Sequence, residues 1–300
     1  TFDNTNLTYL NGRDASFKGT TLNNAELKYS SLYSADLTNA SLLNATNAAT
    51  SNFNAVTWNN TTCVDGTNSD QHNGGSCLNG LDGSKPTSSM TAPTATFQST
   101  SSFRIAWSGS DGSGSGVRTY DVLVSTNGGA WTTWKNDTTG TSANYPGTPT
   151  AGARYCFKVK ATDKAGNVQT NFSAAKCTVV PIDDHSLAKG SGWTGSTAAN
   201  GYLNRTYYST TSKNKYLITT ASKSGVRQVA VLAYKCSSCG SVAVYVGNTK
   251  IGTYSLKRTG SAGRALVTTA RFSAKSGKVK VVAATSGKTV RIDGVGITTT

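Results

Sequence analysis

Large apolar side chains recur at every fifth position through the N-terminal part of the chain, and a small side chain stands two positions before most of them. The other three positions of each repeat are expected to face water. An amphipathic helix needs apolar spacings of three and four, so a uniform spacing of five excludes one. The pattern predicts stacked turns of chain with one large and one small side chain inside each repeat. The large positions are Phe2, Leu7, Phe17, Leu22, Leu27, Leu32, Leu37 and Leu42, with Gly12 and Asn47 in the remaining slots, and after one extra residue Phe53, Trp58 and Cys63.

Beyond the repeat, apolar and polar residues alternate in short segments separated by Gly- and Ser-rich turns. An alternation of period two predicts half-buried β-strands. Glu26 is the only glutamate, and β-branched and turn-forming residues dominate, so we expect an all-β fold. The segments are 94–99, 103–109, 117–125, 130–135, 153–163 and 172–180, and then 202–209, 215–222, 226–235, 241–248, 250–257, 264–272, 278–285 and 289–297.

These patterns divide the chain into three modules, and 300 residues suffice for two or three separate cores. The repeat module covers residues 1–80. A Ser-, Thr- and Pro-rich linker is expected at 81–92. The first group of strands then forms a module at 93–182, and the second group forms one at 183–300.

The repeat in NNAELKYSSLYSADLTNASLLNA, residues 23–45, resembles that of the pentapeptide-repeat family. The resemblance implies a short right-handed quadrilateral β-helix with one coil for every four repeats. Its thirteen slots make about three coils. A disulfide-closed loop between Cys63 and Cys77 is expected to close the C-terminal end of the stack, while the end at Thr1 carries no cap and is expected to meet further repeats or a neighbouring molecule.

The two sandwich modules also resemble known families. In the second, Trp107 matches the core tryptophan and Tyr155 the corner tyrosine of fibronectin type III and bacterial immunoglobulin-like domains. The third, with its late segments VYVGNTKIGTYSL and VRIDGVGI, resembles a galactose-binding-like jelly roll, a form common among carbohydrate-binding modules of secreted hydrolases. The tail as a whole is similar to tails of actinobacterial secreted surface proteins, which implies a bacterial protein that is secreted or attached to the cell surface.

Six cysteines occur as three close pairs, and local pairing within modules is the simplest of the about 15 possible connectivities. Disulfides indicate an oxidising location. A zinc site is disfavoured because it needs four converging ligands and no histidine stands near any pair. The C-x-x-C pair joins two strands, so a structural turn disulfide is favoured over redox catalysis. The pairs are Cys63 with Cys77, Cys156 with Cys177, and Cys236 with Cys239.

Charge is distributed very unevenly along the chain. Residues 1–60 hold 3 basic and 4 acidic residues, residues 61–184 hold 9 of each, and residues 185–300 hold 17 basic residues and one acidic residue, Asp293. Residues 185–300 therefore carry a net charge of +16, which accounts for the +15 of the whole chain. This asymmetry favours an anionic partner over a merely solvated basic face.

Basic and aromatic side chains of the third module are the candidate binding residues for a polyanion or a glycan. Sugars stack on aromatic rings, and lysine or arginine pairs with acidic groups. About half of the rings are expected in the core instead. Asp183 and Asp184 are assigned turn hydrogen bonds rather than a catalytic role. The candidates are Arg205, Lys213, Lys215, Lys278, Lys280, Lys288, Trp193 and Tyr208.

The sequence contains no recognisable catalytic constellation, because His72 and His185 lie in turn-rich segments and no nucleophile, metal-protease or phosphate-loop motif occurs. We therefore expect a non-enzymatic extracellular structural or adhesive protein without a cofactor, which assembles with itself as a fibre or stalk subunit. The candidate assembly edge is Thr1, Phe2 and Leu7. The alternative is a carbohydrate- or cell-envelope-binding accessory region, with an anionic cell-wall polymer or polysaccharide as partner. Neither specific nucleic-acid recognition nor a transmembrane segment is expected.

Overall fold

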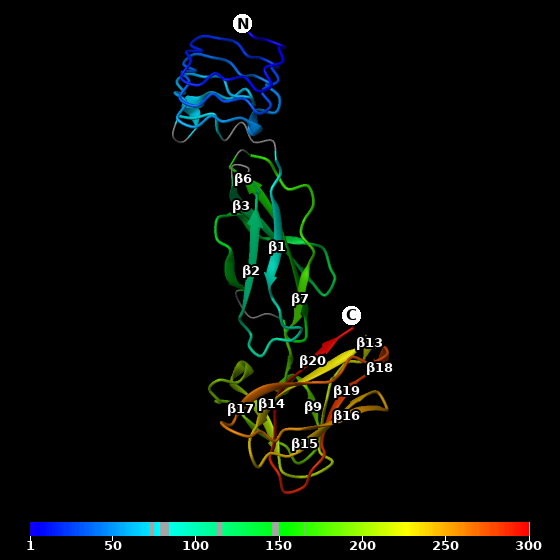
Figure 1. Cartoon of the computed structure of the whole chain (residues 1–300). Helices are drawn as coiled ribbons and strands as arrows, with labels where there is room; N and C mark the ends of the chain where they lie inside the picture. The colour runs from blue at the N-terminus through cyan, green and yellow to red at the C-terminus, as the bar shows by residue number, and fades with distance from the viewer. Residues whose placement is uncertain (73–74, 79–83, 113–115, 146–149, 165, 300) are drawn as a thin grey trace.

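The computed structural model describes the whole chain except residues 73–74, 79–83, 113–115, 146–149, 165 and 300. The described residues are almost entirely strands, bridges and turns, with a few short 3-10 helices. Three groups of elements follow one another along an elongated molecule, and strand β20 returns to the junction between the second and third groups (Figure 1). The fold is therefore all-β, as the alternation and composition predicted.

The N-terminal residues form stacked coils. Parallel bridges join residues twenty apart, from Asn6 with Glu26 to Glu26 with Thr46. Beyond these the partners are 21 apart, because the extra residue is taken up by the 3-10 helix η1 (Ala48–Thr50). The residue two positions after each large apolar one turns in the left-handed region, which Asn and Asp tolerate better than most residues. The leucines of the repeat form the buried axis, with Leu22, Leu27, Leu32, Leu37 and Leu42 fully buried.

The second group of strands packs as two antiparallel sheets around Trp107 and Phe157. Tyr155 occupies the expected corner position, since its hydroxyl accepts a hydrogen bond from the amide of Thr150 at 2.7 Å. One sheet has the order β1 (Thr87–Ala92), β2 (Phe103–Ser110), β5 (Ser142–Tyr145), and the other β4 (Thr132–Thr138), β3 (Val117–Thr126), β6 (Arg154–Asp163), β7 (Lys176–Val179).

Strand β1 lies inside the segment 81–92 that was expected to be linker. Residues 84–86 remain outside strands, and 81–83 lie outside the described residues. Residues 87–92 pair with β2, and Met90 is buried against Trp107. The sequence did not reveal this edge strand because Met90 is its single buried side chain, and the Ser and Thr residues around it are equally typical of linkers.

The third group forms a jelly-roll-like β-sandwich. We call its two layers the junction sheet, which faces the second group, and the distal sheet. Their inner faces bury a core rich in valine. The strand order of the junction sheet is β10 (Thr194–Ser196), β11 (Tyr207–Thr210), β20 (Val290–Thr298), β14 (Gln228–Lys235), β17 (Gly263–Thr268), and β8 (Ile182–Asp183) also pairs with β20. The strand order of the distal sheet is β16 (Thr249–Ser255), β15 (Ser241–Val246), β19 (Val279–Ala283), β12 (Tyr216–Ile218), β9 (Ala188–Lys189). A separate pair consists of β13 (Lys223–Val226) and β18 (Lys275–Gly277).

The two sandwiches meet through a small apolar contact. Phe97 and Val179 of the second pack on Ala230 of the junction sheet, with Leu266 beside them. Gly296 on β20 leaves room for the Phe97 ring, because a Cβ there would come within 2.5 Å of the ring. The guanidinium of Arg264 on β17 crosses the junction and donates a hydrogen bond to the carbonyl of Ser99 at 3.1 Å.

All three expected disulfides are present, and no described cysteine is free. Cys156 and Cys177 join the neighbouring strands β6 and β7, where they stand directly opposite each other. Cys236 and Cys239 close the turn between β14 and β15. Among the described residues, no helix has the length and apolar character needed to cross a lipid bilayer.

Candidate functional site

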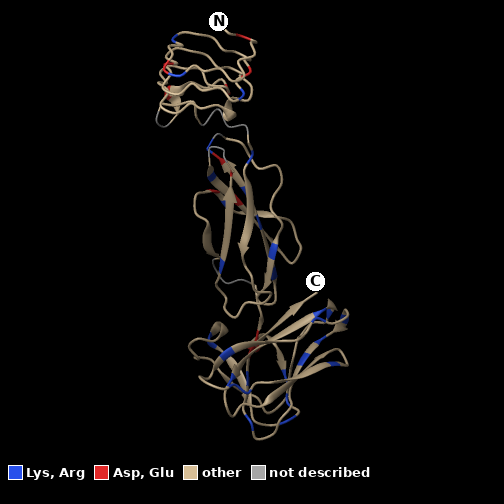
Figure 2. Cartoon of the chain, viewed as in Figure 1, with Lys and Arg blue, Asp and Glu red and all other residues tan. Residues whose placement is uncertain are grey.

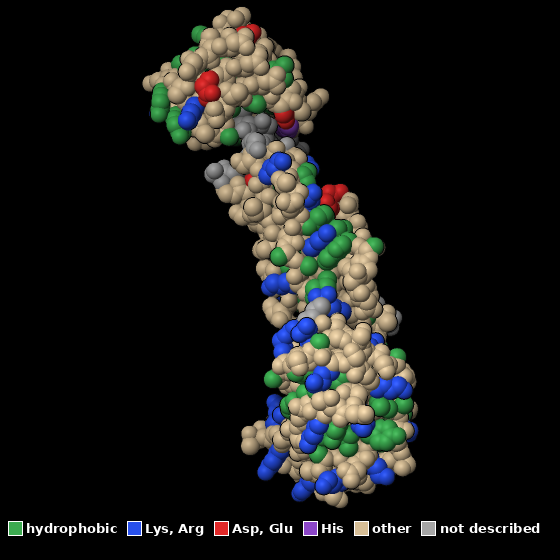
Figure 3. Space-filling model, turned by 90° about the vertical axis from the view of Figure 1, so that its right-hand side faces the viewer, with side chains coloured by type: hydrophobic (Ala, Val, Ile, Leu, Met, Phe, Trp, Pro, Cys, Tyr) green, Lys and Arg blue, Asp and Glu red, His purple; other side chains and the backbone are tan. Residues whose placement is uncertain are grey.

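Basic residues are spread over the elements of the third module (Figure 2). Residues 185–300 hold 17 basic residues and one acidic residue, Asp293, which is completely buried on β20. No side-chain carboxylate from residues 185–299 is therefore left on the surface to neutralise the lysines and arginines. Figure 3 shows these cations interspersed with apolar side chains over the sandwich. Apolar and cationic groups side by side suit a ligand with both sugar rings and acidic groups.

The distal sheet presents a flat solvent-facing surface whose register aligns basic and aromatic residues. Lys250, Tyr245 and Lys280 stand opposite one another on β16, β15 and β19. The Nζ of Lys280 lies 5.0 Å from the centre of the Tyr245 ring, a cation–π distance. Tyr216 on neighbouring β12 exposes 41% of its surface. We call Tyr216, Tyr245, Lys250 and Lys280 the distal face.

The sequence-predicted lysines fall partly on this distal face. Lys280 belongs to it, and Lys278 is exposed two residues earlier, so both side chains leave the sheet on the same side. Lys213 and Lys215 flank the start of β12, where Lys215 Nζ lies 3.5 Å from the hydroxyl of Ser191. Lys288 is exposed in the turn before β20.

The remaining candidates lie elsewhere. Arg205 ends the 3-10 helix η5 (Leu203–Arg205), beside the junction sheet. Trp193 is buried in the core of the sandwich, so its ring cannot stack on a sugar. Tyr208 packs against the same core, with the Lys189 ammonium 4.6 Å from its ring and the His185 ring at 4.5 Å. The eight candidates therefore do not converge on one site. Sequence alternation alone could not tell which aromatic residues face inward.

The sequence did not single out Tyr245 or Lys250, which complete the distal face. Tyr245 occurs in the segment 241–248, where it alternates with buried valines, and this alternation already indicated an outward ring. What the sequence could not supply is the register that sets Tyr245 between Lys250 and Lys280. Pairing across strands depends on the whole sheet order and on the bulge between Val244 and Tyr245.

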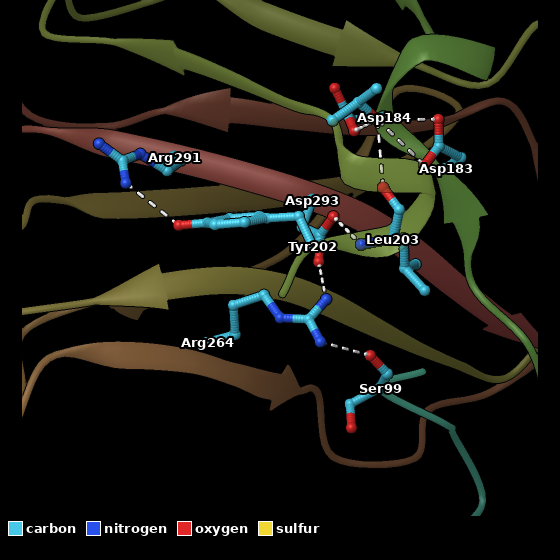
Figure 4. Close-up of polar contacts among 9 residues, drawn as sticks. Ser99, Asp183, Asp184, Tyr202, Leu203, Arg264, Arg291 and Asp293 are labelled. Carbon is cyan, nitrogen blue, oxygen red and sulfur yellow. Dashed lines mark hydrogen bonds and ion pairs between the residues drawn. The ribbon is translucent and has the colours of Figure 1, made fainter. Parts of the chain in front are cut away.

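A second group of residues that the sequence did not reveal is a buried cluster of three carboxylates (Figure 4). Asp183 ends β8, Asp184 begins the 3-10 helix η4 (Asp184–Ser186), and Asp293 lies on β20, which pairs with β8. Asp183 does make the expected turn hydrogen bond, because it accepts from the amide of His185 at 3.2 Å. The segment was treated as a connection, and nothing in its sequence showed that it pairs with the last strand.

Each carboxylate of the cluster has its own partners. The amide of Leu203 donates to Asp293 at 2.9 Å, and the guanidinium of Arg264 forms an ion pair with it. The hydroxyl of Thr206 donates to Asp184 Oδ1 at 2.9 Å. Asp184 Oδ2 has no hydrogen-bond partner, and His185 Nε2 lies 3.9 Å from it.

Burial governs the protonation of this cluster. The pKa of Asp184 is raised to about 7, chiefly by burial and also by the neighbouring Asp183 and Asp293 carboxylates, while the hydrogen bond from Thr206 opposes the shift. Burial also raises the pKa of Asp293 to about 6, although Arg264 opposes the shift. The pKa of Asp183 is raised as well, chiefly by burial. The cluster therefore favours retaining protons that exposed aspartates would lose.

Two groups of described residues have the composition of a metal site. Asp183, Asp184 and Asp293 place oxygens within 4.8 Å of one another, a donor set that suits a hard divalent cation. Arg264 already supplies one positive charge to this cluster. Cys63, Asp65 and His72 also approach within 4.8 Å, so the expectation that no histidine stands near a cysteine pair is wrong for the first pair. Cys63 is in a disulfide, however, and offers no thiolate.

The N-terminal residues assigned to an assembly edge lie on the first coil. Phe2 exposes 41% of its surface, and its ring centre lies 6.4 Å from that of Phe17. Leu7 is half-buried and donates its amide to Glu26 of the next coil at 2.8 Å. Thr1 is exposed. Self-association at this edge stays a prediction.

No protein-family model matches the chain, and no curated protein matches it significantly. Several solved structures share a similar β-architecture over part of it. They include a family 6 carbohydrate-binding module from Clostridium cellulolyticum in complex with xylose (17% identity, 39% of this chain, 95% of that one, TM-score 0.31). Another is the CBM36-1 domain of a multidomain xylanase from the hindgut metagenome of Trinervitermes trinervoides (15% identity, 39% and 93%, TM-score 0.29).

A Paenibacillus xanthan lyase is similar as well, at 10% identity and a TM-score of 0.33, and the match covers 49% of this chain but only 20% of that enzyme. At TM-scores below 0.5, these similarities assign no function to the chain.

Proposed function

We propose that the chain is a non-enzymatic carbohydrate- or cell-envelope-binding region of an extracellular bacterial protein, and that the distal face binds an acidic polysaccharide. The observation that carries the proposal is the alignment of Lys250, Tyr245 and Lys280 across three strands, in a module without an exposed acidic side chain. This proposal replaces the fibre subunit expected from the sequence, for which the described contacts offer no support.

The chemistry of the distal face fits a ligand that carries both sugar rings and negative charge. Tyr216 and Tyr245 offer aromatic surface, on which the apolar face of a pyranose ring stacks. Lys250 and Lys280 then lie within reach of carboxylate or phosphate groups on the same polymer. Because exposed ion pairs are screened by salt, affinity for an acidic polymer should fall as ionic strength rises.

The other two modules serve as spacers in this proposal. The stacked coils correspond to the right-handed quadrilateral β-helix implied by the pentapeptide resemblance, and the middle sandwich corresponds to a fibronectin type III or immunoglobulin-like domain. The supporting observations are the bridges between residues twenty apart and the two antiparallel sheets around Trp107. Three disulfides are consistent with an extracellular location.

Affinity electrophoresis of the full chain tests the proposal, with polygalacturonate as the acidic polymer and xylan as the neutral one. Tyr245→Ala should weaken the retardation of the protein by both polymers, since stacking is lost. Lys280→Gln should weaken its retardation by polygalacturonate alone. Lys135→Gln is the matched control, because Lys135 also lies over an aromatic ring, that of Trp134 at 5.6 Å, but in the middle module. Equal retardation of all variants by both polymers contradicts the proposal.

A further inference from the structure

Two adjoining hollows lie between the middle and C-terminal sandwiches. The first has a volume of about 250 Å³ and is lined by Arg154, Arg271 and residues of β7. The second has a volume of about 410 Å³ and is lined by Arg154, Lys223 and Ile182, among others. Arg154 and Thr298 belong to both linings, so the two hollows share part of their walls and are treated together as one cleft at the junction. We call it the junction cleft.

The junction cleft collects cations from both sandwiches. Arg154 begins β6 of the middle sandwich, Lys223 begins β13, and Arg271 follows β17 in the C-terminal one. Neither hollow has an acidic residue in its lining. Among the described residues, no carboxylate forms an ion pair with any of the three cations. Three cations around one recess, without a counter-charge, raise its positive potential above that of an isolated surface lysine.

Hydrogen bonds hold the backbone on both sides of Arg154. The Arg154 amide donates to the side chain of Asn127 at 2.9 Å, and the amide of Gly152 donates to the carbonyl of Val180 at 2.9 Å. Gly152 has a φ of 77°, and a Cβ there would meet Ile182 at 2.6 Å, so the close approach of the two sandwiches depends on this glycine. Arg154 and Lys223 are half-buried, which limits screening by solvent.

We propose that the junction cleft is a binding site for an oxyanion: a phosphate, sulfate or carboxylate group. Arg154 and Arg271 offer planar guanidinium groups that bind such oxygens in a bidentate manner, and Lys223 adds a point charge. None of these three residues belongs to the distal face, so the site is independent of the proposed polysaccharide surface. Because its cations come from both sandwiches, a bound oxyanion connects the two and stabilises their observed arrangement.

The source of the oxyanion is either a free ion or a group carried on a polymer, and two probes distinguish them. Inorganic sulfate tests the free ion, through its effect on the melting temperature of the full chain. Dextran sulfate tests the polymer, through affinity electrophoresis with uncharged dextran as its reference. Stabilisation by sulfate that is lost when Arg154 and Arg271 are both replaced by Gln means that a free ion suffices, whereas retardation by dextran sulfate alone means that a polymer is required. An absence of both effects overturns the proposal.

Substitutions locate the site. Arg154→Gln combined with Arg271→Gln should lower the affinity for dextran sulfate about tenfold and reduce its dependence on salt, because two ionic contacts are lost. Lys223→Gln with Arg271→Gln provides a second variant that leaves the middle sandwich unchanged. The control, Lys257→Gln with Arg258→Gln, removes the same charge at two exposed positions of the C-terminal sandwich that belong neither to the cleft nor to the distal face. Equal losses in the control and the cleft variants, or unchanged affinity in both cleft variants, overturn the proposal.

Discussion

Replacing Asp184 by asparagine should stabilise the protein at pH 8 and have little effect at pH 4. Asp184 is fully buried, and its Oδ2 accepts no hydrogen bond. Its pKa is raised from 3.8 to about 7, so the folded state holds a proton that the unfolded chain releases. Between about pH 4 and pH 7 the folded state therefore binds more protons than the unfolded state, and the free energy of unfolding falls as pH rises.

The magnitude follows from the same shift. A pKa that rises from 3.8 to about 7 corresponds to at most roughly 4 kcal/mol of stability lost above pH 7. Asp293 acts in the same direction, while Arg264 faces the cluster with a positive charge and His185 lies beside Asp184. The positive charge of Arg264 offsets part of the cost of ionising the cluster. We therefore expect the Asp184→Asn variant to be about 2 kcal/mol more stable than the parent protein at pH 8.

Differential scanning calorimetry of the full chain at pH 4 and pH 8 measures this difference. The control is Asp14→Asn, because the Asp14 side chain is 67% exposed and pairs only with Arg13 at the surface. Its melting temperature should follow that of the parent protein at both pH values. Two results would refute the reasoning. One is a third module of the parent protein that is more stable at pH 8 than at pH 4, and the other is an Asp184→Asn variant that is less stable than the parent at pH 8. The second result would show that the ionised carboxylate is required, as in a bound-cation site.

Three further changes test the packing of the other modules, each by calorimetry of the full chain. Leu32→Ala removes a fully buried side chain from the axis of the coils and should cost about 3 kcal/mol, whereas Leu43→Ala, at an exposed position, should cost little. Serine at both Cys63 and Cys77 opens a loop with a separation of 14 residues and should cost about 3 kcal/mol; an unchanged first transition would show that the loop does not stabilise the coils. Tyr155→Phe leaves the Thr150 amide without its acceptor and should cost about 1–2 kcal/mol, a value near zero meaning that water replaces the hydroxyl.

The sequence predicted the parts of the fold that are set by local periodicity. The spacing of five located the buried leucines, and the alternation of period two located most strands, because both patterns record which side of the chain faces the core. The polar edge strand at Thr87–Ala92 escaped this reasoning, since Met90 is its single fully buried side chain. Disulfide partners were also predictable, because each pair is close in sequence and stays within one module.

The functional residues were harder to predict because they depend on contacts across the sequence. Asp183 and Asp293 are more than a hundred residues apart and meet because β8 pairs with β20. Arg154 and Arg271 come together at the junction of two modules, which no local pattern encodes. Trp193 was wrongly expected to be available to a ligand, because it stands in a turn-rich segment. Only the folded structure shows that the core of the sandwich buries it.

The connection between the two sandwiches has a mechanical consequence. Strand β7 ends at Val179 and β8 begins at Ile182, so only two residues separate strands in different modules. Tension applied to a C-terminal sandwich held on a surface is therefore transmitted directly into β7, with no slack to extend first. The Cys156–Cys177 disulfide joins the edge strand β7 to β6, and β6 pairs with β3 in the same sheet. The sheet therefore shares the load, and β7 is not pulled away from it alone. The middle module is thus built to carry a pulling force between its neighbours.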